Sequence, residues 1–341
     1  MPATQTQVLD ALLEYRLGFI GARWNFPAAV GSLLSAPGGI GTAVALTYSF
    51  PTSLPAYDSG ITDFTGFTAN QQSAAIAVLT QYSSVANVTF SLSGSSGLAN
   101  LAFGQNTTSS VFTSSPSTAG YANYPSWSYS WNGSNVITSV TEFGGGSAGD
   151  VMIRTNVYAQ TEYAAGNGGY ALLLHEIGHI MGLKHPFQGA ATLPSDLDHN
   201  GYTVMAYNDA PHGIIVTVTG NSSSYSWSWQ NVVPRSLMVG DMLALQTAYG
   251  ANLNYQSGAN VYSWGVGEKF LETVWDGGGT DTIDASNQLL ACVINLTPGA
   301  FSSIGYRQTH AELYQDIPSF SAATLAGASG MLAPATIERR H

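Results

Sequence analysis

Hydrophobic residues recur at helical spacing in one clear segment of the N-terminal half of the chain. They occupy positions 75, 78, 79, 82 and 85. The preceding Thr68-Ala69-Asn70-Gln71 forms a capping box, in which side chains satisfy the free N–H groups of a helix start. The pattern therefore predicts a helix over 69–85.

Shorter helix patterns and strand patterns occur elsewhere in the chain. Further helices are predicted near Gln7–Leu17, over Tyr170–Met181 and over Leu237–Tyr249. Glycine, the residue type favoured just past a helix end, follows the last two. Strands are predicted at Ala45–Phe50, Val88–Leu92, Leu98–Phe103 and Val151–Arg154. Residues 106–149 are rich in Ser, Gly, Tyr and Trp and are predicted to be loops, with room for one edge strand.

The pattern changes near residue 250. Beyond Ala251, short strands and glycine turns replace the helices. Mixed strands and helices followed by strands alone predict an α+β domain over 1–250 joined to a β-rich domain over 251–341.

Composition narrows the class of protein. The chain has 341 residues, 9 Lys+Arg against 20 Asp+Glu, and a formal net charge of −11. Because nucleic acids and anionic membranes recruit Lys and Arg, this balance argues against both as partners. No apolar run reaches the roughly 20 residues that span a bilayer, and no N-terminal signal peptide is visible. Cys292 is the single cysteine, so a secreted protein of this kind would gain stability from its core or from metal.

Metal-binding chemistry is concentrated in residues 175–185, which read His-Glu-Ile-Gly-His-Ile-Met-Gly-Leu-Lys-His. His175 and His179 lie four residues apart on a predicted helix, so their rings project from one face and can hold one cation. Gly182 can adopt a positive φ, which breaks the helix and lets His185 approach the same ion. Three neutral imidazoles suit zinc with a fourth position left for water, as in a catalytic site.

Glu176 follows the first histidine and is expected to point beside the metal. A carboxylate there can take a proton from zinc-bound water as general base and then pass it to the leaving amine. The alternative is three core histidines that share a helix by coincidence. Against it, three of the seven histidines of the chain fall within 175–185.

The pattern H-E-x-x-H-x-x-G-x-x-H resembles that of the metzincin zinc peptidases. Pro186 after the third histidine, and the later Met205-Ala206-Tyr207, are similar to the serralysin branch. The segments ALTYSF, ANLAFG and MVGDMLALQTAYGAN follow the serralysin order, so the resemblance covers most of 45–296. It implies an α+β metzincin catalytic domain, a twisted mixed sheet with an active-site helix. A truncated β-rich domain that resembles the start of a β-roll or sandwich is expected to follow.

The same resemblance assigns further site residues. It implies that Met205 forms a hydrophobic base under the zinc, and that Tyr207 ligates zinc and stabilises the oxyanion. It also implies an upper edge strand, against which a peptide substrate pairs, formed by Ala119, Gly120, Tyr121 and Ala122. Two departures from the family are Ala206, where serine is frequent, and a short stretch between the zinc motif and the methionine turn.

A second metal is suggested by residues 276–281, Asp-Gly-Gly-Gly-Thr-Asp. They offer carboxylates and carbonyls in a tight turn, the hard oxygen ligands that calcium prefers, although an ordinary glycine turn is an equal alternative. The serralysin resemblance implies calcium and extends the ligand set to Gln256, Gly258, Asn260, Asp276, Gly278, Gly279, Asp281, Thr336 and Glu338. The family's tandem G-G-x-G-x-D repeats are absent, so the sequence is expected to be naturally short or truncated.

These features predict a secreted, extracellular and monomeric zinc endopeptidase that hydrolyses protein or peptide substrates. A non-catalytic extracellular binding module that depends on calcium is the alternative from another class. A third possibility is a protease whose main substrate is its own N-terminal segment.

Overall fold

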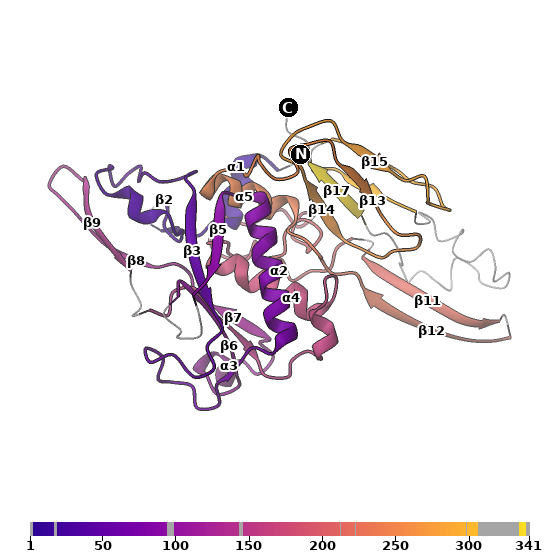
Figure 1. Cartoon of the computed structure of the whole chain (residues 1–341), viewed down its shortest axis with the longest axis horizontal. Coiled ribbons are helices and arrows are strands. Elements are labelled where there is room, and N and C mark those ends of the chain that lie inside the picture. Colours follow the sequence, from indigo (N-terminus) through magenta and orange to yellow (C-terminus); the bar gives the residue numbers. More distant parts are fainter. Residues whose placement is uncertain are drawn as a thin grey trace.

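The computed structural model of the chain describes residues 3–16, 19–93, 99–142, 146–211, 213–221, 223–297, 299–305 and 334–338. It shows a central body from which two strand ribbons project at the left and right of Figure 1. No helix in these ranges is long and apolar enough to cross a membrane.

A mixed sheet forms the centre of the body. Its strands run in the order β5 (Val88–Leu92), β3 (Val44–Ser49), β6 (Leu101–Asn106), β10 (Asp150–Arg154) and β7 (Gly120–Ala122). The first four are parallel to their neighbours, whereas β7 is antiparallel to β10, and the short β4 (Thr65–Gly66) is antiparallel to β6. The β6 strand is buried along its whole length, as expected for a central strand. The β7 strand ends the sheet and leaves one edge open.

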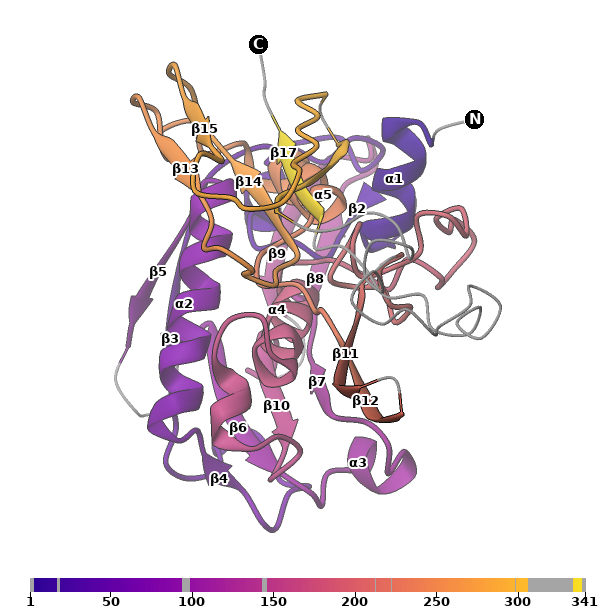
Figure 2. The ribbon, with the colours of Figure 1, turned by 90° about the vertical axis from the view of Figure 1, so that its right-hand side faces the viewer.

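Two helices cover one face of this sheet. The helices α2 (Ala69–Val85) and α4 (Gly168–Ile180) lie side by side in front of the strands in Figure 2. Their apolar sides share one core with the sheet and with α1 (Gln5–Leu12) and α5 (Val239–Tyr249). The remaining short elements of the N-terminal part are β1 (Tyr15–Arg16), β2 (Phe19–Ile20), η1 (Phe26–Ala29), α3 (Ser110–Ser114) and η2 (Gln160–Tyr163).

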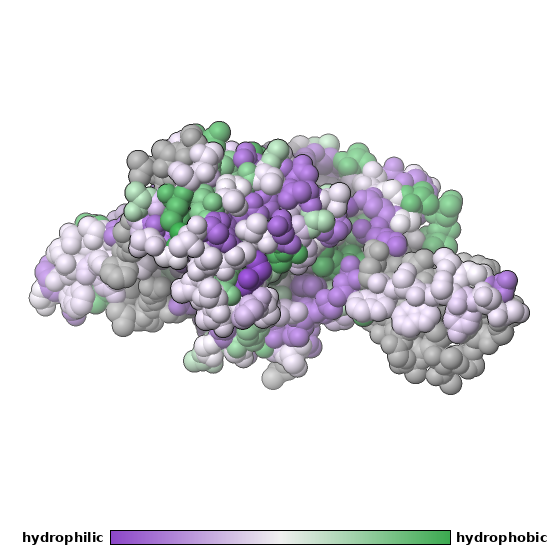
Figure 3. Space-filling model, turned by 90° about the horizontal axis from the view of Figure 1, so that it is seen from below, coloured by the Kyte–Doolittle hydropathy of each residue, from purple (hydrophilic) through white to green (hydrophobic). Residues whose placement is uncertain are grey.

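The two projecting ribbons are antiparallel hairpins. One pairs β8 (Trp127–Trp131) with β9 (Ile137–Glu142), and the other pairs β11 (Ile214–Asn221) with β12 (Ser224–Asn231). Seen from below, they form the two ends of an elongated molecule (Figure 3).

The C-terminal part contains strands and a small core of its own. Here β13 (Val261–Ser263) is parallel to β15 (Thr282–Asp284), and β17 (Pro334–Glu338) lies between β14 (Glu272–Trp275) and β16 (Phe301–Ser303). Trp264, Phe270, Val274 and Ile304 form a buried cluster separate from the main core. This agrees with a β-rich C-terminal region, while the boundary near residue 250 stays a prediction.

The predicted fold class, α+β with a mixed sheet and a histidine-bearing helix, is confirmed. The predicted helix 69–85 and its capping box are observed, as is the predicted strand at Val88–Leu92. The helix predicted near Gln7–Leu17 is wrong in its end, because the chain becomes extended at Leu13 to bridge Leu183.

Two predictions for the middle of the chain also need correction. The strand predicted at Leu98–Phe103 begins at Leu101 and runs on to Asn106, while 94–98 lie outside the described residues. Residues 106–149 contain β7, the one edge strand that is allowed for, but also α3 and the β8–β9 hairpin where loops are predicted. In β8, aromatic residues alternate with serines, which is a strand pattern.

The chain reverses sharply after α4 at Gly182. This residue has a φ of +96°, in the left-handed region that favours glycine. A Cβ at this position would lie 2.1 Å from the carbonyl oxygen of Ala22, which is far inside van der Waals contact. Glycine is therefore required here twice, by backbone conformation and by space.

The N-terminal segment pairs with the reversed chain. Leu13 and Leu183 form an isolated antiparallel bridge. On one side of it, the Glu14 N–H donates to the carbonyl of Gly182 at 3.1 Å. On the other side, the Lys184 N–H donates at 2.7 Å to the carbonyl that precedes Leu13.

Side chains reinforce this pairing. The indole N–H of Trp24 donates to the Ile180 carbonyl at 2.8 Å, and the Tyr249 hydroxyl donates to the Met181 carbonyl at 3.0 Å. The ammonium group of Lys184 donates to three backbone carbonyls at 2.6–3.0 Å, those of Ala11, Gln188 and Ala191. The reversed chain is thus held on both sides by residues from distant parts of the sequence.

Substituting Gly182→Ala is expected to destabilise the protein by about 2–5 kcal/mol, the sum of left-handed strain and overpacking against Ala22. The control is Gly189→Ala, since Gly189 also has a positive φ (+81°) but no atom within 4 Å of its Cβ position. It should cost only about 1–2 kcal/mol. Urea unfolding of both variants measures the difference, and equal losses would contradict the role given to Ala22.

Candidate active site

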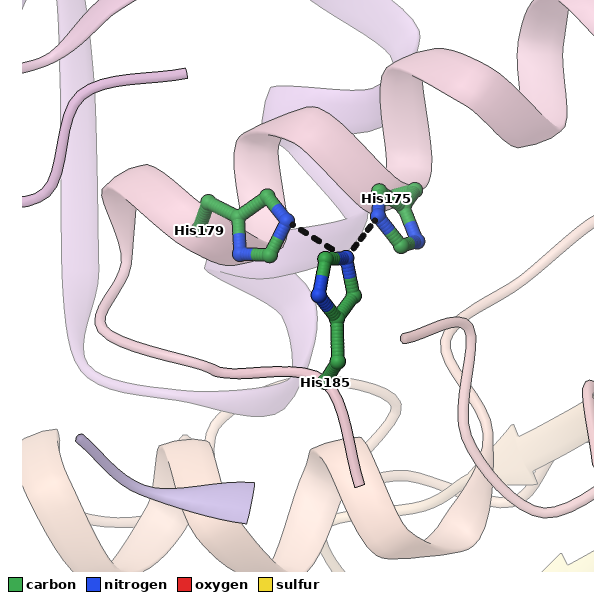
Figure 4. A group of neighbouring side chains, drawn as sticks. All are labelled: His175, His179 and His185. Atoms are coloured by element: carbon green, nitrogen blue, oxygen red, sulfur yellow. Dashed lines mark hydrogen bonds between the residues drawn. The ribbon is translucent and has the colours of Figure 1, made fainter. Parts of the chain in front are cut away.

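Three histidines converge at the end of α4. His175 and His179 project from one face of the helix, and His185 returns from the chain beyond the Gly182 turn (Figure 4). The Nε2 of His185 lies 3.0 Å from that of His175 and 3.2 Å from that of His179. Within the described ranges, this is the one group of three or more His, Cys, Asp or Glu side chains arranged to hold a metal.

Hydrogen bonds fix the tautomers of two of these rings. The Nδ1 of His175 lies 2.8 Å from the Val204 carbonyl, and that of His179 lies 2.9 Å from the Leu183 carbonyl. A carbonyl oxygen can only accept, so both Nδ1 atoms carry the proton and both Nε2 atoms present lone pairs. His185 can carry one proton on its Nε2, so it can donate a hydrogen bond to the Nε2 of His175 or to that of His179, but not to both.

This arrangement fits a cation such as zinc. Nitrogens at the zinc–imidazole distance of about 2.0–2.1 Å stand about 3.3 Å apart at the corners of a tetrahedron, close to the observed separations. Burial lowers the pKa of all three rings, that of His175 to about 4, so they are neutral, as ligands must be. The three histidines can therefore hold the zinc ion that the sequence predicts.

The turn around Met205 packs against α4 and contacts the first histidine of the triad. Asp241 is fully buried and accepts from the Thr203 hydroxyl at 2.6 Å and from the Val204 N–H at 2.9 Å. The Val204 carbonyl in turn holds His175, and the sulfur of Met205 packs against α4 where a Cβ at Gly178 would stand 2.4 Å from it. Asp241 thus orients the first histidine through the backbone of this turn.

Glu176 has an environment unlike that of Asp241. It is 3% exposed, and its Oε2 has no hydrogen-bond partner among the described residues. Burial raises the pKa of its carboxyl to about 8. A Cβ at Gly120 would lie 2.7 Å from its Oε1, so the edge strand lies directly against the carboxyl group. Glu176 is therefore a buried, incompletely bonded carboxyl beside the triad.

Two tyrosines reach the triad. The hydroxyl of Tyr207 lies 3.0 Å from the Nε2 of His185, and its ring packs against His185 and Phe187. The hydroxyl of Tyr124 lies 3.0 Å from the Nδ1 of His179. Tyr207 is implied by the sequence resemblance, whereas Tyr124 is not predicted, because nothing in its local sequence indicates that β7 passes over α4.

A cleft of about 600 Å³ opens beside the triad. One wall is formed by α4 and the Met205 turn, and the opposite wall by the chain that leads into β7. Among its lining residues are His175, Glu176, Tyr207, Ala119, Gly120, Val233 and Pro234.

The register of β7 determines which of its groups face this cleft. Gly120 pairs with Ile153 and Ala122 with Val151, while hydrogen bonds join Ala119 and Asn123 to β10 on either side. Hydrogen-bonded pairs alternate with non-hydrogen-bonded pairs in antiparallel strands. The N–H and C=O groups of Gly120 and Ala122 therefore point away from β10, toward the open edge, whereas those of Tyr121 point toward β10.

The structure also brings together most of the segments named for calcium. A Cβ at Gly279 would lie 2.0 Å from the Gly258 carbonyl, so 256–260 and 276–281 are in contact. The Asn260 N–H donates to Asp281 at 3.0 Å, and Asn260 also contacts Gln256. Asp276 accepts from the N–H of Gly278 at 2.8 Å. Residues Thr336 and Glu338 lie on β17, but their side chains are outside the described set. Calcium stays a prediction.

Comparisons with known proteins agree with this site. Residues 241–317 match the family described as Peptidase M10 serralysin C terminal. Metallopeptidase AprA of Pseudomonas marginalis is 28% identical over 285 residues, which are 77% of this chain and 54% of that protein. Serralysin B of Dickeya chrysanthemi is 27% identical over 281 residues, 78% of this chain and 53% of that protein.

Two further matches are partial. Serralysin of Proteus mirabilis is 30% identical over 172 residues, 45% of this chain and 33% of that protein. A solved structure of myroilysin aligns with 64% of this chain and 98% of its own at 14% identity, with a TM-score of 0.31, too low to support an argument.

The chain spans about half the length of the first two relatives. The match to the serralysin C-terminal family begins inside α5. The chain is thus similar to serralysin metallopeptidases over most of its length, and its residues 241–317 match the serralysin C-terminal family.

Proposed function

We propose that the chain is a zinc-dependent endopeptidase that hydrolyses peptide bonds in proteins. The observation that carries the proposal is the buried, incompletely bonded Glu176 carboxyl beside three neutral histidines in a cleft. Bound by His175, His179 and His185, zinc would supply a Lewis acid that polarises a carbonyl and lowers the pKa of water.

The chain's own residues carry the protons. Glu176 accepts a proton from the attacking water and then donates it to the leaving nitrogen. The carboxyl group lies against Gly120 on one side and lines the cleft on the other, so both proton transfers take place in the cleft. The hydroxyl of Tyr207 donates a hydrogen bond to the oxygen of the scissile carbonyl, where negative charge develops. This tyrosine is 67% exposed and so has room to turn between His185 and a substrate.

The open edge of β7 is the proposed substrate platform. An extended peptide can add to it as a further strand and bond to the outward N–H and C=O groups of Gly120 and Ala122. This binding uses backbone groups of the substrate, so it is independent of substrate sequence.

We also propose that the protein acts outside the cell as a monomer on protein or peptide substrates. The sequence is acidic, with few lysines and arginines and one cysteine, which suits an extracellular enzyme stabilised by metal instead of disulfides. The relatives named metallopeptidase and serralysin support proteolysis.

Glu176→Gln is expected to lower kcat for casein or peptide cleavage by about 10²- to 10⁴-fold, because glutamine cannot accept the proton. One zinc per chain should be retained, as measured by atomic absorption. Glu142→Gln, which removes an exposed carboxylate on β9, is the control and should cleave at the parent rate. Undiminished cleavage in the zinc-loaded Glu176→Gln chain would refute the mechanism. A zinc-loaded parent that cuts nothing would favour the non-catalytic alternative.

Ala122→Pro tests the edge strand. Proline removes the outward N–H of Ala122 and leaves the hydrogen bonds to β10 intact, so kcat/KM should fall about 5- to 10-fold, the worth of one hydrogen bond. Ala122→Ser keeps the N–H at similar size and should retain the parent value. Both variants should unfold within a few degrees of the parent, and equal kcat/KM for the two would argue against strand addition.

We further propose that the segments 256–260 and 276–281, with Thr336 and Glu338, bind calcium. Their contact places two carboxylates and several backbone carbonyls in one turn, as a hard cation requires. Such a site would stabilise the C-terminal region, whose own core is small.

Calcium is expected to raise the unfolding temperature of the zinc-loaded protein by several degrees. Occupancy at 100 times the Kd contributes about 2.7 kcal/mol. Metal-free protein supplied with zinc alone, or with zinc and calcium, gives the comparison in a thermal scan. Asp281→Asn should abolish the rise and Asp196→Asn, an exposed site elsewhere, should keep it. A parent protein insensitive to calcium would disprove the site.

A further inference from the structure

The β11–β12 hairpin is a ribbon with two chemically different faces. Among the described strands, β11 and β12 pair only with each other, and the hairpin extends away from the body at the right of Figure 1. In β12, Tyr225, Trp227 and Trp229 alternate with serines, so the three aromatic residues share one face. On the other face, the hydroxyls of Thr219 and Ser226 bond across the strands at 2.8 Å. We call Tyr225, Trp227 and Trp229 the aromatic stripe.

The stripe is unusually accessible. Trp227 and Trp229 are each 59% exposed and Tyr225 is 47% exposed. Between described residues, the two tryptophans make no ring contact or side-chain hydrogen bond. Exposed tryptophans gathered on one face are typical of an interaction site, because their burial by a partner is strongly favourable.

The same chain contains an internal comparison. Strand β8 also alternates aromatic residues with serine, Trp-Ser-Tyr-Ser-Trp, but two of its rings are covered. Trp127 stacks on Phe26 and donates to the carbonyl of Arg23, and Tyr129 packs edge-on against Phe26. An aromatic face of this pattern is therefore covered by the chain itself in β8 and presented to solvent in β12.

The hairpin is continuous with the cleft. Its two strands leave and re-enter the body between Gly213 and Val232, which are joined by a 2.6 Å backbone hydrogen bond. The next two residues, Val233 and Pro234, line the cleft together with His175 and Glu176. The base of β12 is therefore adjacent to the lining of the cleft at Val233.

The spacing and charge of the stripe indicate what it binds. Side chains on one face of an extended chain repeat every 6.6–6.8 Å or so, which is also the spacing of the stripe. No Asp, Glu, Lys or Arg occurs between Asp209 and Arg235, so the two strands themselves carry none of these charges to pair with a charged ligand. Anionic polymers and anionic membranes are further disfavoured by the net charge of −11.

We propose that the aromatic stripe is an exosite for the substrate polypeptide, selecting extended, uncharged chains with aromatic or large aliphatic side chains at alternate positions. The stripe engages substrate residues distant from the scissile bond. The proposal rests on the proposed peptidase function and adds to it a preference that the cleft alone does not impose.

Three peptides with the same central bond test the exosite. One has six residues, one extends it by ten residues on each side with Leu or Phe at alternate positions, and one has Ser at those positions. Ten residues cover the eight-residue β12 at about 3.3 Å each. The parent should cleave the apolar long peptide with a kcat/KM at least about tenfold above that for the serine peptide. In Trp227→Ser/Trp229→Ser this ratio should fall to about one. Ser226→Ala/Ser228→Ala, on the opposite face, should keep the parent ratio.

The outcomes separate the exosite from the peptidase function. Cleavage of the six-residue peptide with equal kcat/KM for the two long peptides overturns the exosite and leaves the function standing. If no peptide is cut, binding of the labelled long peptides is measured by fluorescence anisotropy. Tighter binding of the apolar peptide than of the serine peptide, lost in the tryptophan variant, supports the exosite without catalysis. Absence of that binding overturns it.

Two other occupants are tested directly. Cosedimentation with phosphatidylcholine vesicles that depends on Trp227 and Trp229, without any preference between the long peptides, would assign the stripe to membranes and overturn the proposal. Dimerisation that depends on the same residues, measured by sedimentation velocity, would assign it to a second copy and overturn it equally.

Discussion

The left-handed turn at Gly182 is the constraint on which the metal centre depends. A helix can supply two histidines from one face, but the third must come from a chain running in another direction. The Gly182 φ of +96° provides that change of direction within three residues of His185. The carbonyl of Ala22 closes the space on the other side of the turn, so the N-terminal segment and the turn fit each other without room for a side chain.

Two buried carboxylates show how the same group serves structure or chemistry. Asp241 accepts three hydrogen bonds, from a hydroxyl and two backbone N–H groups, and it organises the chain beneath His175. Glu176 has one oxygen without a hydrogen-bond partner among the described residues, and it lines a cleft. A buried carboxylate with all its hydrogen bonds made stabilises the structure around it. A buried carboxylate that lacks partners lowers the stability of the fold, and a role in catalysis explains its presence.

Local patterns predicted those parts of the fold that local interactions determine. The capping box of Thr68 and Gln71 set the start of α2 to the residue, and the spacing of three histidines with Gly182 predicted the convergence that is observed. Side-chain type at fixed spacing was sufficient in both cases.

Parts that depend on distant contacts were not predictable in this way. The end of α1 is set by a bridge to Leu183, and the contact of Tyr124 with His179 arises because β7 crosses α4. The β11–β12 ribbon has a strand pattern, yet which face of it remains exposed depends on what the rest of the chain leaves uncovered. No local sequence rule contains that information.

The hydrogen bonds that hold the turn between His179 and His185 have a consequence for folding during synthesis. Trp24 and Tyr249 are 225 residues apart, and both bond to the carbonyls at the end of α4. Trp24 thus meets its partner Tyr249 only after 225 further residues have been translated. Contacts this distant form late in folding. A nascent chain therefore lacks part of the support for the turn that carries His185 until Tyr249 has been made.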